Sequence, residues 1–289
     1  MNKAVCKIDL HMHTVVSDGT DTPRSIIAKV KEAGIGLFSV TDHDAVKCGN
    51  IIPMLLEEDD PFFIPGVEFS CRDEEGKYHI LGYDFDPVAS SVIRVVTLGH
   101  SFRIKKVKAR LDFLKDEFGF TFPEDELAAL MTMDNPGKPH IGNMMVKYGY
   151  AETKEQAIKQ YIDKIRFKNE YVRPETAISG ILAGGGIPVL AHPSYGSGDE
   201  LIIGEDMEKR LKKLMAFGLR GVEAFYSGFT KKLQEEVLGL AEKYNLYVTA
   251  GSDYHGSNKM VVLGDTGFGS DTVMPQGMQR FLERIGYTA

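Results

Sequence analysis

The chain has 289 residues, of which 43% are hydrophobic and 26% are charged, and its net charge is −7. A chain of this length can bury a large core, and this composition is typical of a soluble globular protein. The negative charge argues against general affinity for nucleic acid, and no stretch approaches the roughly 18 apolar residues of a membrane span.

The sequence starts without an extended apolar segment, so it predicts no signal peptide. Its three cysteines are odd in number and lack the CxxC spacing of a thiolate metal site. They predict reduced thiols in a cytoplasmic protein. Since no apolar span is present, we expect no membrane partner. The sequence predicts no oligomeric state. These cysteines are Cys6, Cys48 and Cys71.

Short apolar runs alternate with helical segments in the first part of the chain. Strands are expected over residues 4–10, 37–41, 62–67 and 78–83. Thr22 can cap a helix that Pro23 opens and Gly34 ends. The apolar stripe of that helix is Ile26, Ile27 and Val30.

This alternation stops between residues 87 and 172, where the pattern predicts helices alone. Helices are expected over residues 88–117, 123–130, 139–148 and 153–165, with glycines at the breaks. The sequence therefore predicts two domains. Residues 1–86 and 173–289 form one, and residues 87–172 form a helical insertion.

Strands and helices alternate again in the last part. Strands are expected over residues 187–191, 221–226 and 246–250, with helices over 174–184, 205–217, 230–244 and 275–285. Seven strands separated mostly by helices predict a parallel sheet, either a barrel or a doubly wound sheet. In both folds, polar residues at the carboxyl ends of strands meet at one rim.

Histidines and carboxylates gather at these strand ends. His11 and His13 project from one face of the first strand, about 7 Å apart. Imidazole and carboxylate without thiolate suit zinc, manganese or iron(II). Nine such ligands are enough for two or three divalent ions. The candidate metal ligands are His11, His13, Asp18, His43, Glu68, His79, His192, Asp253 and His255.

The order of these motifs resembles the PHP (polymerase and histidinol phosphatase) superfamily. The motifs are His11-x-His13, Asp42-His43, Glu68 with His79, His192, and Asp253-x-His255. The resemblance implies a distorted (β/α)7 barrel with a helical insertion. The local sequences Ser17-Asp18-Gly19-Thr20 and Thr41-Asp42-His43-Asp44 are similar to those of 3′,5′-nucleotide bisphosphate phosphatases and a related 5′-to-3′ exoribonuclease.

The resemblance also implies how the ligands divide. One ion would be held by His11, His13, Glu68 and Asp253. Glu68 would bridge to a second ion held by His79 and His192. A third ion would take Asp18, His43 and His255. Asp42, Asp44 and Glu223 are expected to orient ligand imidazoles.

A site with several divalent ions would be net positive and would favour an anionic substrate. We therefore expect a metal-dependent phosphoesterase that hydrolyses a nucleotide phosphate monoester, such as the 3′-phosphate of a 3′,5′-bisphosphonucleotide or the phosphate of AMP. A hydroxide shared by two ions would attack phosphorus. Two alternatives stay open: a 5′-to-3′ exoribonuclease acting on short RNA, and a non-catalytic metal-binding regulatory module.

The insertion carries basic residues that could select the substrate. Arg103 and Arg110 lie seven positions apart on one predicted helix, so they share a face. A guanidinium can bind phosphate with two parallel hydrogen bonds. Lys138 and His140 resemble a basic-Pro-His element in the insertion of this branch. We expect these four residues to bind a second phosphate of the substrate.

Overall fold

The computed structural model describes residues 7–166, 170–196, 200–269 and 271–287. The chain divides into two compact units, and each is described by itself. The first comprises residues 1–96 with 172–289, and the second comprises residues 97–171. Residues 4–6 of the first predicted strand, including Cys6, lie outside the described residues.

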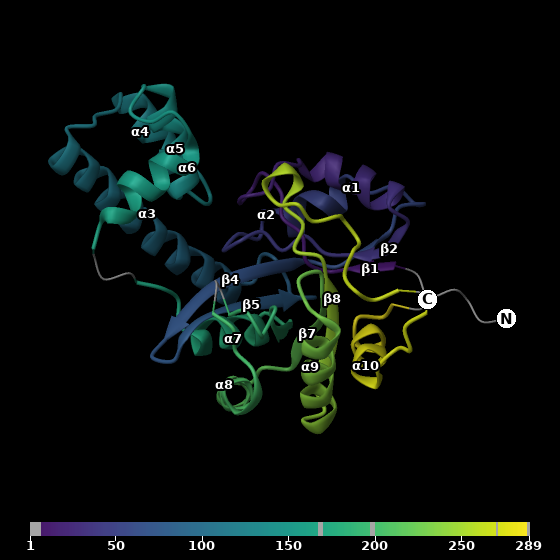
Figure 1. Cartoon of the computed structure of the whole chain (residues 1–289). Helices are drawn as coiled ribbons and strands as arrows, with labels where there is room; N and C mark the ends of the chain where they lie inside the picture. Colours follow the sequence, from purple (N-terminus) through teal and green to yellow (C-terminus); the bar gives the residue numbers. More distant parts are fainter. Residues whose placement is uncertain (1–6, 167–169, 197–199, 270, 288–289) are drawn as a thin grey trace. The chain divides into compact units, whose positions relative to one another are not determined.

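The described strands of the first unit form two sheets (Figure 1). The first sheet has the order β1 (Lys7–Asp9), β2 (Ile35–Phe38), β3 (Phe62–Phe63). The second has the order β4 (Gly66–Asp73), β5 (Gly76–Tyr83), β6 (Ile187–Leu190), β7 (Gly221–Tyr226), β8 (Tyr247–Gly251). Pairing is parallel throughout the first sheet and from β6 to β8.

The prediction of a wholly parallel sheet is wrong at β5. This strand pairs antiparallel with both β4 and β6. Only Glu74 and Glu75 separate β4 from β5. A turn this short can join only antiparallel strands, because a parallel pair needs a crossover of about a dozen residues. The predicted third strand is also divided, since Ile64 and Pro65 interrupt it between β3 and β4.

A few backbone contacts link the two sheets at both edges. Leu10 N donates to Ala250 O at 2.9 Å, and His13 N donates to Tyr254 O at 2.8 Å, which joins the end of β1 to the end of β8. At the other edge, an isolated bridge pairs His43 with Glu68. Within the described residues these strands therefore form two linked sheets and not one continuous ladder.

Helices cover the sheets of the first unit. They are α1 (Pro23–Glu32), α2 (Lys47–Ile51), η1 (Ile52–Met54), α7 (Pro174–Ala183), α8 (Gly204–Ala216), α9 (Lys231–Lys243), η4 (Gly256–Asn258) and α10 (Gln276–Arg284). Helix α9 packs on β7 and α10 packs on β8 (Figure 1). The Thr22 side chain accepts from Ser25 N at the start of α1, so the predicted cap is confirmed.

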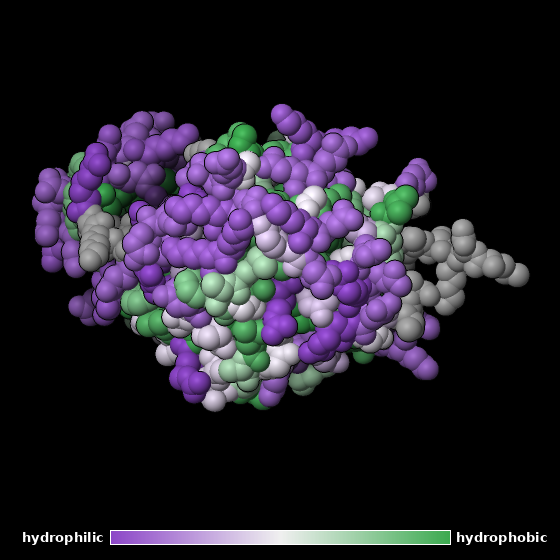
Figure 2. All heavy atoms as spheres, turned by 90° about the horizontal axis from the view of Figure 1, so that it is seen from below, coloured by the Kyte–Doolittle hydropathy of each residue, from purple (hydrophilic) through white to green (hydrophobic). Residues whose placement is uncertain are grey.

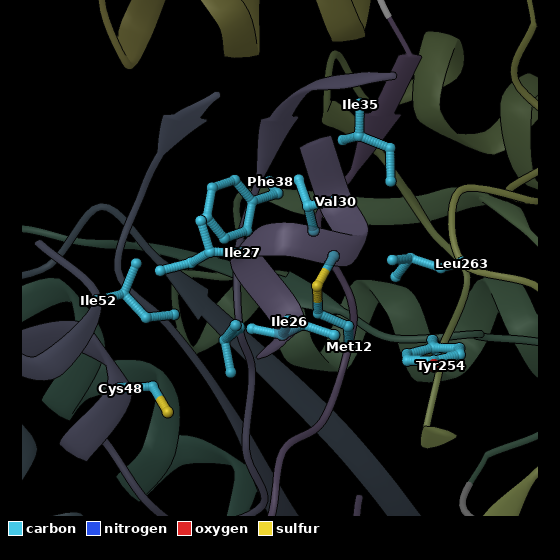
Figure 3. Close-up of a cluster of buried hydrophobic side chains, with 11 residues drawn as sticks. Met12, Ile26, Ile27, Val30, Ile35, Phe38, Cys48, Ile52, Tyr254 and Leu263 are labelled. Atoms are coloured by element: carbon cyan, nitrogen blue, oxygen red, sulfur yellow. The ribbon is translucent and has the colours of Figure 1, made fainter. Parts of the chain in front are cut away.

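A hydrophobic cluster fixes the segment after β1 that carries the first two histidines (Figure 3). Met12 packs there with Ile26 and Val30 of α1 and with Phe38 of β2. Burying a side chain of this size contributes about 1.5–3 kcal/mol. Because successive side chains of a strand alternate in direction, fixing Met12 in the core turns its two histidine neighbours to the opposite face.

The second unit has its own core. Helix α3 (Ser90–Phe118) begins in the first unit, where Val95 packs against Gly180, and continues into the second. The other helices are α4 (Glu124–Thr132), α5 (Lys138–Lys147), α6 (Lys154–Gln156), η2 (Ala157–Tyr161) and η3 (Ile162–Lys164). Val107, Leu114 and Ile141 are buried among them. The described residues of this unit contain no strand, as predicted.

Among the described residues, no helix is both long enough and apolar enough to cross a membrane. Seen from below the view of Figure 1, the surface is mostly hydrophilic, and hydrophobic residues form smaller patches (Figure 2). Cys48 and Cys71 are buried and form no disulfide. Burial raises the pKa of both thiols, so neither is an activated nucleophile.

Candidate metal centre

All nine predicted metal ligands come together in the first unit. His11 and His13 follow β1, and Glu68 and His79 lie on the β4–β5 hairpin. His192 follows β6. The remaining members of the cluster are Asp18, His43, Asp253 and His255. Most of these side chains are buried, and Asp18, His43 and His79 are partly exposed.

Glu68 lies at the middle of the cluster, where one carboxylate faces five imidazoles. Its Oε2 atom lies 3.3 Å from both His11 Nε2 and His13 Nε2, and 3.0 Å from His43 Nδ1. Its Oε1 atom lies 2.7 Å from His79 Nδ1 and 3.3 Å from His192 Nε2. The two oxygens thus face two different sets of histidines, as a bridging ligand requires.

The other two carboxylates face the histidines from either side. Asp253 Oδ1 lies 3.6 Å from His11 Nε2 and 3.4 Å from His13 Nε2. Asp18 lies 3.6 Å from His13 Nδ1, 3.8 Å from His43 Nε2 and 3.4 Å from His255 Nε2. Every imidazole of the cluster therefore has a ring nitrogen within 3.8 Å of a carboxylate oxygen.

Three groups of these side chains have the spacing to hold a metal ion. They are His13, Asp18, His43 and His255; His11, His13 and Asp253; and His43, Glu68 and His79. His13 and His43 each belong to two groups, so the spacing does not divide the ligands as the resemblance implies.

The donor atoms themselves fit a metal. His11 Nε2 and His13 Nε2 are buried and make no hydrogen bond within the described part of the chain, although carboxylate oxygens lie close by. Buried polar atoms nearly always have a partner, so these nitrogens need a cation or a proton between them and the carboxylates. Imidazole nitrogen with carboxylate oxygen is a donor set that suits divalent transition metals.

The charges of the cluster depend strongly on one another. Burial opposes a charge on His13, but Asp253, Glu68 and Asp18 together raise its pKa to about 9. Burial acts in the same way on His11, yet Glu223, Glu68 and Asp253 raise its pKa well above the usual value. Despite burial, the histidines hold the pKa of Glu68 well below its usual range. The metal-free site therefore favours ionised carboxylates with protons on His11 and His13.

Two hydrogen bonds orient ligand imidazoles. Glu223 Oε1 lies 2.9 Å from His11 Nδ1, which turns Nε2 of that ring towards Glu68. The other oxygen of Glu223 accepts from His192 N at 2.8 Å. His255 Nδ1 donates to Asp253 O at 2.8 Å, which leaves its Nε2 facing Asp18. The predicted orienting role of Glu223 fits this geometry.

Asp42 and Asp44 accept hydrogen bonds from groups close to the proposed ligands. Asp42 accepts hydrogen bonds from Thr14 N at 2.8 Å, Thr14 Oγ1 at 2.8 Å and Ser17 Oγ at 2.7 Å. It therefore fixes the turn that follows His13, and it reaches the His13 ring through Ser17 Oγ, which lies 3.4 Å from His13 Nδ1. Asp44 accepts from Ser70 N at 3.0 Å.

The backbone at the cluster adopts unusual conformations. His192 has φ 25° and Asp253 has φ 59°, which are rare for residues with a side chain. Such strain is typical of functional sites. Gly251 at the end of β8 is also required, because a Cβ there would lie 2.2 Å from His11 Cβ and 2.3 Å from Glu223 Oε1.

A cavity of about 430 Å³ opens beside the cluster. Its lining includes ligand candidates and also Tyr195, Tyr226 and Lys259. Lys259 was not predicted as a site residue. It lies in the polar loop after His255, where neither periodicity nor a motif identifies a lysine as functional. Its position depends on the path of η4, which starts from Gly256 at φ 65°.

The four predicted substrate-binding residues lie in the second unit. Burial lowers the pKa of the Arg110 guanidinium, and the nearby charge of Arg103 lowers it further. Lys138 forms an ion pair with Asp163, which also lies near Arg110. His140 Nδ1 accepts from Gly137 N at 3.2 Å at the start of α5. The structure thus places Arg110 near both Arg103 and Asp163, and it pairs Lys138 with the same aspartate.

No protein-family model matches the chain. It is 27% identical over 272 residues to a 5′-3′ exoribonuclease of Haemophilus influenzae, covering 93% of this chain and 97% of that protein. It is 25% identical over 262 residues to a 3′,5′-nucleoside bisphosphate phosphatase of Chromobacterium violaceum, covering 87% of this chain and 88% of that protein.

A solved structure from Bifidobacterium adolescentis, described as a metal-dependent phosphoesterase, has the same fold. The TM-score is 0.79 with 25% sequence identity, and the match covers 97% of this chain and 96% of that one. These similarities extend over nearly the whole chain, including both units. Together with the ordered histidine and carboxylate motifs, they show that the chain is a hydrolase that is similar to metal-dependent phosphoesterases over nearly its whole length.

Proposed function

We propose that this chain hydrolyses a phosphate monoester of a nucleotide, using two or three divalent ions of manganese, zinc or iron. The observation that carries this proposal is the position of Glu68, whose two oxygens face five imidazoles. A shared carboxylate between two sets of nitrogen donors is the arrangement expected of a bridged metal pair. A non-catalytic metal-binding module would not need a bridged pair beside an open cavity.

The proposed ligand sets follow the resemblance. His11, His13, Glu68 and Asp253 would hold one ion; Glu68, His79 and His192 a second; Asp18, His43 and His255 a third. When bound, the ions would activate water and neutralise charge on the phosphoryl group. Glu223 holds the His11 ring and the His192 backbone in place for binding.

We propose that the strands of the first unit form a distorted seven-stranded barrel around these ligands. The contacts from β1 to β8 and from His43 to Glu68 support this arrangement, because they join both edges of the two sheets. Such a barrel would bring the strand ends to one mouth, where sites of this kind are built.

The helical insertion is proposed to select the substrate. Arg103, Arg110, Lys138 and His140 would bind a second phosphate, for which arginine's planar fork is well suited. Lys138 and Arg110 lie near Asp163, and Arg103 lies near Arg110, so three positive charges gather beside this one carboxylate. A nucleoside 3′,5′-bisphosphate, the substrate in the name of the Chromobacterium relative, has such a second phosphate.

A second candidate function is 5′-to-3′ exoribonuclease activity on short RNA. It is favoured by the long match to the Haemophilus relative of that name. The net charge of −7 disfavours it, because RNA binding usually depends on an extended positive surface. Both candidates would use the same metal ligands, so only a comparison of substrates separates them.

The experiment compares adenosine 3′,5′-bisphosphate, AMP, histidinol phosphate and a 5′-phosphorylated RNA oligonucleotide, each with Mn²⁺ and with a chelator. We expect phosphate release from at least one mononucleotide, and loss of that activity with the chelator and in His192→Ala. Release of mononucleotides from RNA alone would favour the exoribonuclease. Equal rates in wild type and His192→Ala would refute the catalytic assignment.

A further inference from the structure

The two carboxylate oxygens of Asp253 face different surroundings. Oδ1 faces the imidazoles, 3.4 Å from both His13 Nε2 and His255 Nδ1. Oδ2 points away from them and accepts from Lys259 Nζ at 2.6 Å and from Tyr226 OH at 3.0 Å. Lys259 is therefore fixed beside a proposed metal ligand without being one.

Lys259 also lines the cavity that opens beside the cluster. Its side chain is 42% exposed, so the ammonium is accessible from the cavity. Among the described residues that line this cavity, it is the only lysine or arginine. An ammonium has three N–H donors, and the hydrogen bond to Asp253 uses one of them. The other donors can bind a ligand in the cavity.

The loop that carries Lys259 is held against the cluster. Asn258 Nδ2 donates to Asp18 O at 2.8 Å, and Ser257 N donates to Thr20 Oγ1 at 3.0 Å. These bonds connect the loop to the turn that bears another proposed ligand, Asp18. The position of the ammonium is thus fixed at both the side chain and the backbone, which reduces the entropy lost on binding.

We propose that Lys259 binds a non-bridging oxygen of the reacting phosphoryl group and makes the site prefer monoesters over diesters. This inference rests on the proposed function of the same site. A phosphate monoester carries nearly two negative charges at neutral pH, whereas a diester carries one. An additional fixed cation therefore stabilises a bound monoester more than a bound diester, in a cavity where water screens the charges less than at an open surface.

A purely structural role for Lys259 predicts a different result. If the lysine only held Asp253 in place, its loss would impair hydrolysis of both ester types equally. Tyr226→Phe provides this comparison, because it removes the other hydrogen bond to Asp253 Oδ2 and leaves the charge unchanged. We expect Tyr226→Phe to lower both activities by the same factor.

The test uses the full chain loaded with Mn²⁺ and two probes, p-nitrophenyl phosphate as monoester and bis(p-nitrophenyl) phosphate as diester. Lys259→Met should lower kcat/KM for the monoester about tenfold to a hundredfold. It should lower kcat/KM for the diester less than about threefold, with unchanged manganese content. Lys259→Arg should keep the preference for the monoester.

Lys31→Met is the matched control. Lys31 is 52% exposed and forms an ion pair with Asp60 at 2.8 Å on the surface, so its loss removes a comparable pair away from the cavity. This control should hydrolyse both probes like wild type. Equal losses for the two probes in Lys259→Met, or no loss at all, would overturn the inference.

Binding of inorganic phosphate separates this inference from the proposed function. Calorimetry on the manganese-loaded protein should give a Kd about tenfold higher for Lys259→Met than for wild type. An unchanged Kd would refute a phosphate contact at Lys259. If wild type hydrolyses neither probe and no nucleotide, the proposed function is wrong, and the phosphate affinities alone then decide the role of Lys259.

Discussion

The metal cluster and the basic cluster of the second unit are built in opposite ways. The first consists of buried imidazoles and carboxylates that face one another at strand ends. The second consists of three partly exposed basic residues on helices, Arg103, Arg110 and Lys138, of which the last two lie near Asp163. The comparison teaches that a sheet fixes the positions of side chains that must bind a metal together. A helix surface, in contrast, carries basic side chains that can be replaced without unfolding the protein.

The largest effect is expected from Glu68→Gln, which tests whether metal binding by the five surrounding histidines depends on the Glu68 carboxylate. The change keeps the size of the side chain and removes the charge shared by five imidazoles. We expect phosphate release from the preferred nucleotide to fall on the order of a thousandfold, with reduced manganese content. Steady-state rates and elemental analysis would measure both.

Glu58→Gln is the control for this variant, because Glu58 is exposed in the turn after η1. It should keep wild-type activity and metal content. Full manganese content and an unchanged rate in Glu68→Gln would show that the shared carboxylate is dispensable. The proposed metal ligands would then tolerate substitution as well as the basic residues of the second unit.

A smaller effect is expected in the basic cluster. Arg103→Met should raise KM for adenosine 3′,5′-bisphosphate about tenfold, because one charge-assisted hydrogen bond to phosphate is lost. KM for AMP should change less than about threefold. Lys105→Met is the control, since Lys105 is 64% exposed and pairs with Glu170 at 2.9 Å. Equal changes for the two nucleotides in Arg103→Met would exclude Arg103 from binding the second phosphate.

The last effect concerns how metal binding depends on pH and does not involve a substitution. In the metal-free protein the pKa of His13 is about 9, above its usual 6.5. The stability that its charge contributes is present below pH 6.5 and is lost as pH rises through 9. Mn²⁺ must displace this proton, so the affinity for Mn²⁺ should rise about tenfold per pH unit for each proton displaced, up to pH 9.

Calorimetry in buffers with different ionisation enthalpies would count the protons released on Mn²⁺ binding. We expect about one or more at pH 7.5. An affinity that does not change between pH 6.5 and 9 would contradict protonation of His13 in the metal-free site.

The sequence allowed the cluster to be predicted because the histidine and carboxylate motifs lie in or after predicted strands, and strand ends meet at one rim. His11 and His13 share a face by the period of a strand alone. The reversal of β5 was missed, because Glu74 and Glu75 do not form a typical hairpin-turn sequence and apolar runs do not reveal direction. Lys259 was missed because its position depends on the path of a loop, and the hydrophobic periodicity of a sequence does not predict that path.

The contacts between β1 and β8 have a consequence for synthesis. His11 can meet Asp253 only after the last strand has left the ribosome, since the two are separated by most of the polypeptide. A nascent chain that stops before Tyr247 has no β8 and lacks two of the nine proposed ligands. The complete set of proposed ligands can therefore assemble only late in biogenesis, after the last strand has emerged.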